Sequence, residues 1–152
     1  MRKFKWSYLA LLPFVICVVF LNLLGKLFGL TYKQISVVFN LWLQGVALVL
    51  SAILPAVLSV CLLCSGFSVW RLLLVCFFVV YALLHVWAFL RMIRHYHLPF
   101  NDAFDLCVDD LKELAGRWHT TYQIVNLLIF VIAFLFLLAV NMGLSYLIYQ
   151  HL

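Results

Sequence analysis

Hydrophobic residues are concentrated in four long stretches that contain no acidic residue, lysine or arginine. These stretches cover residues 6–24, 35–64, 72–90 and 122–149. A helix needs about 20 apolar residues to cross a hydrocarbon core about 30 Å thick, and each stretch is long enough. Helices satisfy their own backbone polar groups, which lipid cannot do. The pattern predicts an all-α integral membrane protein with four transmembrane helices, in a single domain over residues 1–152.

A fifth segment, residues 101–118, has a different pattern. Its apolar residues recur at helical spacing, whereas all five acidic residues of the chain lie between them. We expect Asn101 to cap the start of this helix and Asp102 to lie in its first turn. The sequence thus predicts an amphipathic interfacial helix between spans three and four. Its apolar stripe consists of Phe104, Cys107, Val108, Leu111, Leu114, Ala115 and Trp118.

The composition supports the bilayer as the main partner of this chain. Hydrophobic residues make up 68% and charged residues 10%, against about 25% charged in soluble domains. The net charge of +5 does not indicate nucleic-acid binding, because most basic residues flank the spans, where cations meet lipid headgroups. These flanking residues are Arg2, Lys3, Lys5, Lys26, Lys33, Arg71, Arg91 and Arg94.

Four crossings would place both termini on one side of the membrane. The basic residues before the first span favour a cytoplasmic N-terminus, and the first helix usually dominates orientation. Summed over all segments, the basic count instead favours the opposite orientation. We expect a multi-pass protein with cytoplasmic termini.

Short polar and glycine-containing segments separate the spans. Gly25 and Gly29 are expected to break the chain after the first span, and residues 65–68 form a tight turn that makes spans two and three an antiparallel hairpin. Pro55 is the expected kink site in the long second span. No internal repeat is apparent from the hydropathy pattern.

The second span carries a stripe of polar and small residues. The stripe consists of Asn40, Gln44, Ala47, Ser51 and Pro55, which recur at helical spacing and share a face. Such a face commonly joins membrane helices through close packing and hydrogen bonds. The alternative is a pore or transport path that Asn40, Gln44 and Ser51 line. His85, deep in the third span, is expected to bond a polar group on a neighbouring helix, with haem or metal binding as the alternative.

Cys61 and Cys64 form a Cys-x-x-Cys pair near the end of the second span. This layout resembles four-helix disulfide-generating membrane proteins, which implies a thiol or quinone redox role for the two residues. Those proteins also use a second cysteine pair in a water-exposed loop, and outside the apolar stretches this chain has only Cys107. In a run rich in Leu, Val and Cys, chance spacing is the favoured explanation.

Metal binding and catalysis have little support in the sequence. His95, His97 and His119 flank the 101–118 segment, but a transition-metal site needs more ligands at suitable spacing. No triad order, phosphate-binding glycine loop or His-Glu-x-x-His is present. We therefore expect no metal, no cofactor and no enzymatic activity.

The leading functional interpretation is a small membrane subunit or accessory protein. It would form homo- or hetero-oligomers through its transmembrane helices. The row of acids on the 101–118 helix offers a polar surface for docking a partner. This row consists of Asp102, Asp105, Asp109 and Glu113.

Overall fold

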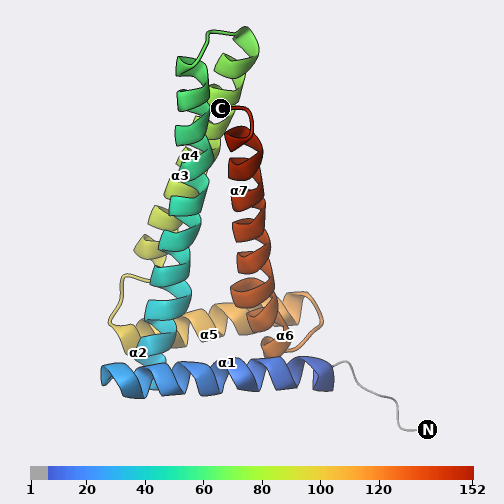
Figure 1. Cartoon of the computed structure of the whole chain (residues 1–152). Coiled ribbons are helices and arrows are strands. Elements are labelled where there is room, and N and C mark those ends of the chain that lie inside the picture. The colour runs from blue at the N-terminus through green and yellow to red at the C-terminus, as the bar shows by residue number, and fades with distance from the viewer. Residues whose placement is uncertain (1–6) are drawn as a thin grey trace, which may run out of the picture. The chain divides into compact units, whose positions relative to one another are not determined.

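The computed structural model describes residues 7–152, and every element in this range is a helix (Figure 1). The start of the first predicted span and the basic residues before it lie outside the described range. The elements are α1 (Ser7–Phe28), α2 (Tyr32–Val37), η1 (Val38–Leu43), α3 (Gln44–Cys64), α4 (Val69–His95), α5 (Phe100–Arg117), α6 (Tyr122–Leu127), η2 (Leu128–Ala133) and α7 (Phe134–Tyr149).

Four helical stretches are long and apolar enough to cross a membrane. They are Leu11–Phe28, Tyr32–Cys64, Val69–His95 and Tyr122–Tyr149. The second and fourth each combine a short α-helix, a π-helical segment and a long α-helix. The all-helical fold and the four membrane-length apolar helices are thus as the sequence predicts. The third helix extends beyond the predicted 72–90, because Arg91 to His95 continue it without a breaking residue.

The end of α1 differs from the prediction at Gly25. This residue lies inside the helix, and a Cβ there would approach the Leu30 carbonyl oxygen to 2.8 Å. Gly29, with a φ of 67°, is the residue that ends the helix. The Leu30 N–H donates to the Gly25 carbonyl at 2.8 Å, which is the six-to-one bond of a Schellman motif. Gly25 therefore permits a close backbone approach instead of breaking the chain.

The start of α5 also differs from the prediction. Pro99, not Asn101, is the N-cap residue, and the Ala103 N–H donates to the Pro99 carbonyl at 2.9 Å. Asn101 is exposed inside the first turn beside Asp102. The fixed φ of proline suits the entry to a helix, so the helix begins before the first side chain that could cap it.

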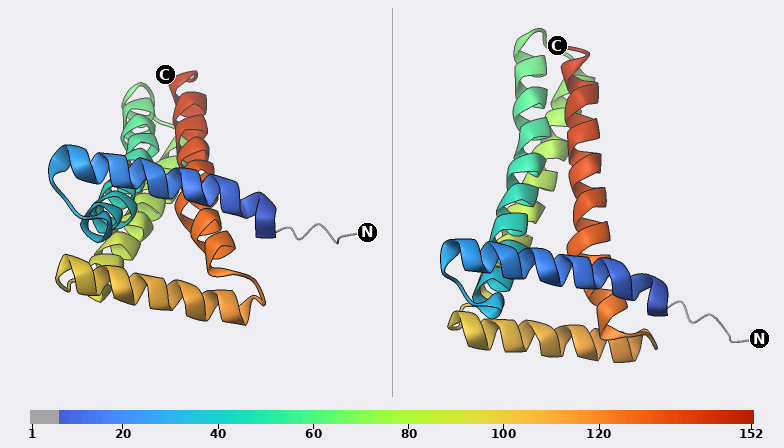
Figure 2. Two further views of the ribbon diagram at one scale, coloured as in Figure 1. Left: turned by 90° about the horizontal axis from the view of Figure 1, so that it is seen from below. Right: turned by 60° about the horizontal axis from the view of Figure 1, so that its bottom comes forward.

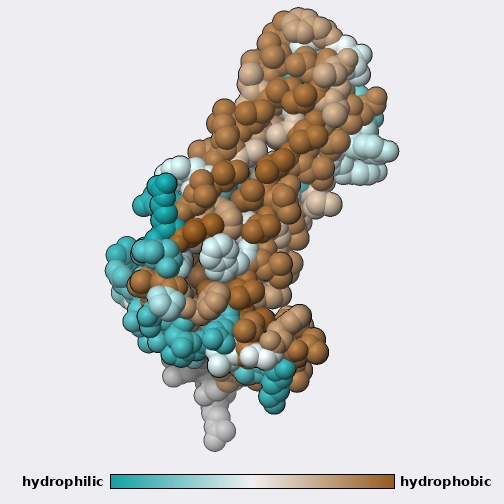
Figure 3. Space-filling view, turned by 90° about the vertical axis from the view of Figure 1, so that its left-hand side faces the viewer, coloured by the Kyte–Doolittle hydropathy of each residue, from teal (hydrophilic) through white to brown (hydrophobic). Residues whose placement is uncertain are grey.

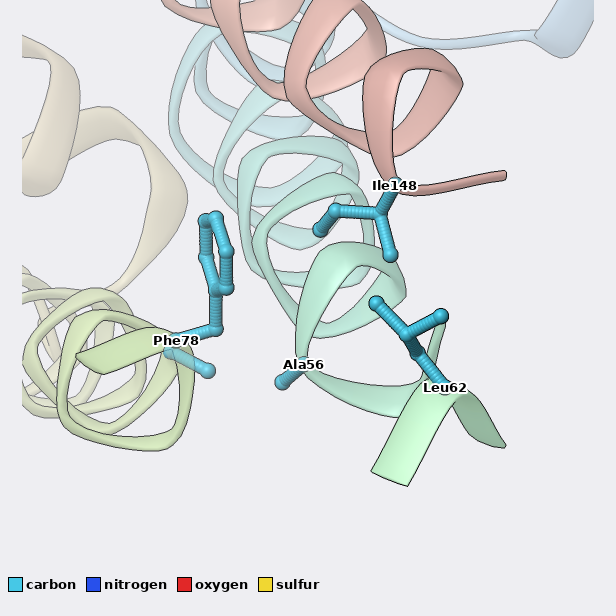
Figure 4. Packing of buried hydrophobic residues seen from close by; sticks show 5 residues of the cluster. Ala56, Leu62, Phe78 and Ile148 are labelled. Atoms are coloured by element: carbon cyan, nitrogen blue, oxygen red, sulfur yellow. The ribbon is translucent and has the colours of Figure 1, made fainter. Parts of the chain in front are cut away.

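The helices form two compact units within what the sequence predicts as a single domain. Unit 2 comprises Leu43–His95 and Phe134–Leu152, and holds α3, α4 and α7. Residues 65–68 connect α3 and α4 as the predicted hairpin. In addition, α7 packs along α3. Side chains from all three helices meet in its core (Figure 4). This core consists of Ala56, Leu62, Phe78, Ala82 and Ile148.

Unit 1 comprises the chain up to Trp42 together with Tyr96–Ala133. Within it, α1 and α5 each pack against both short helices, α2 and α6. In both views of Figure 2, α1 and α5 run alongside each other in opposite directions. Leu111, Ala115 and the fully buried Val125 form the apolar core of this unit.

The structure reveals an internal repeat, contrary to the sequence prediction. The segments α2 and η1 recur as α6 and η2 at an offset of 90 residues, and α3 and α7 begin 90 residues apart. The two residues with φ between +20° and +160° among those described, Gly29 and His119, also differ by 90. Without gaps, seven of the nineteen residues in 14–32 are identical to their counterparts in 104–122. The repeat is therefore visible in sequence as well as in backbone geometry.

Candidate functional site

A buried polar network joins the three helices of unit 2. Asn141 on α7 has no exposed surface, and its Nδ2 donates to Ser51 Oγ on α3 at 2.8 Å. The Ser51 hydroxyl donates its own proton to the Leu48 carbonyl at 2.9 Å. Since Ser51 Oγ must then accept from Asn141, the orientation of the Asn141 amide is defined. Its Oδ1 accepts from the Tyr81 hydroxyl of α4 at 2.7 Å.

His85 extends this network by one turn along α4. Its Nδ1 lies 3.0 Å from the carbonyl oxygen of Tyr81, and the two rings are 4.5 Å apart between centroids. A carbonyl oxygen only accepts, so Nδ1 carries a proton. The partner of Nδ1 is therefore the backbone of its own helix.

The rest of the predicted polar stripe is divided between the two units. In unit 2, Gln44 is buried with Ser51, and the fully buried Pro55 continues the same face. Gly45 packs against α4 so closely that a Cβ there would lie 2.5 Å from the Phe89 ring. Asn40 belongs to unit 1, where it is half-buried. Small and polar residues on α3 therefore face neighbouring helices in unit 2.

The four acids of the predicted docking row are exposed on α5. Asp105 accepts from Lys33 Nζ through both carboxylate oxygens, at 2.7 and 2.8 Å, and Lys33 also lies over the Phe104 ring. Asp109 pairs with Lys112, and Glu113 pairs with Arg117. Exposed pairs of this kind contribute at most about 1 kcal/mol each. Their carboxylates remain open to solvent.

The fifth acid, Asp110, belongs to a half-buried cluster in unit 1. Its Oδ2 accepts from the Tyr96 hydroxyl at 2.8 Å. Burial raises the pKa of Tyr96, and the bond to Asp110 raises it further. Burial, followed by the nearby Asp110 charge, raises the pKa of Cys107 to about 11, against the opposing effect of a hydrogen bond with Tyr96. Cys107 is therefore a protonated, weakly nucleophilic thiol at neutral pH.

Cys61 and Cys64 are free thiols on the exposed side of α3. Nearby, Arg71 Nη1 donates to the Leu62 and Gly66 carbonyls, at 3.1 and 2.8 Å, and to Ser65 Oγ. Arg71 thus satisfies the open end of α3. Among the described residues, no group of three or more His, Cys, Asp or Glu side chains is placed to hold a metal ion.

Sequence reasoning did not single out Asn141 and Tyr81 as partners of Ser51. The signal that could have found one of them is the repeat, because Ser51 and Asn141 are separated by 90 residues. No protein-family model matches the chain, and neither a curated protein nor a solved structure is detectably similar to it.

Proposed function

We propose that this chain is an integral membrane protein that acts without catalysis, as a subunit or accessory partner of a membrane assembly. The observation that carries the proposal is the use of polar groups in unit 2. Ser51, Tyr81 and Asn141 bond to one another across three helices, as polar groups do in transmembrane bundles. These three polar groups are thus engaged in helix packing.

The outer surface supports a bilayer environment. On the face shown in Figure 3, apolar side chains cover the long helices, and large apolar residues elsewhere are also exposed. A soluble monomer rarely exposes contiguous apolar patches above a few hundred Å². Lipid or other transmembrane helices would cover this surface, and we propose homo- or hetero-association through it.

The distribution of charge supports an interfacial, amphipathic role for α5. It buries Ala103, Leu111 and Ala115 and exposes its row of acids. Carboxylates are costly inside hydrocarbon, so this helix would lie at the membrane surface. The exposed acids would then be available for docking a soluble or membrane partner.

A pore lined by Asn40, Gln44 and Ser51 is the second candidate. Burial of Gln44 and Ser51 against neighbouring helices favours the packing interpretation over it. A redox role for Cys61 and Cys64 is a third, for which purified protein would carry a quinone or haem absorption band.

Replacing a packing residue tests the first candidate against the second. We expect Gln44→Leu or Ser51→Leu to weaken the bundle or its association by about 1 kcal/mol or less per hydrogen bond lost. Size-exclusion chromatography in mild detergent and ion flux into vesicles would be measured together. Leu50→Ile, on an exposed part of α3, is the matched control. Intact assembly with abolished flux in the Gln44 variant would favour the pore instead.

A further inference from the structure

The repeat makes α1 and α5 equivalent helices. In their aligned parts, five positions are identical, and none of these side chains is exposed. They are the pairs Phe14 and Phe104, Cys17 and Cys107, Val18 and Val108, Leu21 and Leu111, and Leu24 and Leu114. The identities therefore lie on the faces that both helices turn toward the rest of unit 1.

The contacts of α1 and α5 are equivalent too, because each helix packs on the short helix that follows the other one in the chain. The Phe14 and Tyr122 rings meet edge to face with centroids 6.0 Å apart, and the equivalent rings of Phe104 and Tyr32 meet at 5.7 Å. Correspondingly, α1 packs on α6 and α5 packs on α2. A pseudo-two-fold axis within unit 1 accounts for both exchanges.

The outward faces of the two helices have opposite chemistry. Where α5 exposes an acid or arginine, α1 exposes an aliphatic side chain at the equivalent position. The pairs are Leu12 and Asp102, Val15 and Asp105, Val19 and Asp109, Leu23 and Glu113, and Leu27 and Arg117. One face is suited to water and the other to hydrocarbon.

The direction of the pseudo-two-fold axis follows from the order of crossings. If α3 crosses the membrane and α4 returns, α5 reaches the side from which α2 began, and α6 begins on that side too. An axis that exchanges α2 and α6 then runs along the membrane normal, as in parallel internal repeats. Such an axis gives α1 and α5 the same inclination to the membrane. Because α5 is too acidic to cross, α1 does not cross either.

We infer that α1 lies along the membrane plane at the same depth as α5 and does not cross the membrane. This inference rests on the membrane insertion proposed above. The chain then makes three crossings, by α3, α4 and α7, and its termini lie on opposite sides. From the sequence, four crossings and termini on the same side are expected instead. That expectation rests on the length and apolarity of α1, because hydropathy contains no information about the contacts of a helix.

Depth measurements on spin labels test this inference in phosphatidylcholine–phosphatidylglycerol vesicles. Single labels would be placed by Leu12→Cys, Val19→Cys and Leu27→Cys on full-length protein lacking its five native cysteines, and oxygen and nickel-chelate collision rates compared. Leu12 and Leu27 are about 22 Å apart along a helix axis, at 1.5 Å per residue. We expect the three labels to report one depth. A Val19 label much deeper than the two flanking labels would mean that α1 crosses, and would overturn the inference.

Labels on α3 separate failure of this inference from failure of the membrane proposal. Leu50 and Val60 are exposed and lie about 15 Å apart along α3. We expect Leu50→Cys to report a deeper position than Val60→Cys. If this gradient is present but α1 crosses, only the in-plane inference fails; if α3 shows no burial in lipid, both fail. Compartment-sensitive reporters at the two termini should give opposite signals, and matching signals would contradict three crossings.

Discussion

At the scale of single residues, Asn141 shows how polar groups are accommodated in an apolar bundle. The chain places the amide on α7, but its two partners come from α3 and α4. Leaving a buried amide without partners would cost more than its bonds contribute, so the three helices must keep their mutual rotation. A residue that the sequence alone marks only as polar thereby determines how three helices fit together.

Replacing Asn141 with Leu should reduce the free energy of unfolding by about 1 to 2 kcal/mol, because the bonds to Ser51 and Tyr81 are lost. Denaturation in detergent micelles would measure the change. Combined with Ser51→Ala, the loss should be less than additive, since the two residues share one bond. Asn126→Leu, which removes only a 3.4 Å contact with Tyr122, is the control and should cost less. Equal losses in both asparagine variants would argue against the network.

Ser36 offers the opposite case, a buried hydroxyl without a hydrogen-bond partner among the described residues. We expect Ser36→Ala to increase stability by about 1 kcal/mol, because burying an unsatisfied hydroxyl is unfavourable. The same unfolding assay applies. Ser145→Ala is the comparison, since Ser145 donates to the Asn141 carbonyl and should gain nothing from truncation. A loss of stability in the Ser36 variant would show that the hydroxyl is satisfied after all.

Asp110 should control the reactivity of Cys107. Removing the neighbouring charge by Asp110→Asn lowers the pKa of the thiol, which burial and Asp110 together raise to about 11. More thiolate is then present at pH 8 to 9, and alkylation in a variant with only this cysteine should accelerate several-fold. The raised pKa also means that Cys107 contributes stability below pH 9, which is lost as pH rises toward 11. An unchanged pH profile of alkylation in the Asp110 variant would contradict this coupling.

At the scale of elements, hydropathy predicts where the helices lie better than it predicts where they end or which helices contact one another. The long apolar runs identify four helices because length and apolarity are local properties. The ends depend on backbone geometry: a Schellman motif places the stop at Gly29, and Pro99 starts α5 ahead of Asn101. The repeat was missed because opposite outward chemistry hides the shared inward face. Pairing of Ser51 with Asn141 requires helix rotations that a single sequence does not specify.

The acidic face of α5 yields a prediction at the same scale. If a partner docks on these acids, Asp105→Lys with Asp109→Lys should abolish its recovery while the helices still insert. Affinity purification after membrane fractionation would measure both. Because Asp105 also pairs with Lys33, Lys33→Gln serves as the control and should leave recovery intact. Unchanged recovery of the partner after the double reversal would contradict docking on these acids. The helix α5 would then only cover the membrane surface.

At the scale of the whole molecule, the chain has four helical stretches of membrane length and an internal repeat whose two copies are offset by 90 residues. Its buried polar groups are used in helix packing, and its exposed surface is apolar along the long helices and acidic on α5. We propose that this division of chemistry serves association within and beside the bilayer.

Purification in mild detergent followed by native mass analysis tests the proposed function most directly. It reports stoichiometry, bound protein partners and any cofactor on the same intact sample. We predict a defined oligomer or a fixed ratio to another membrane protein, held through the transmembrane helices and weakened by Ser51→Leu. The proposed function would be contradicted by a strictly monomeric chain that carries a stoichiometric quinone or haem and is unchanged by Ser51→Leu.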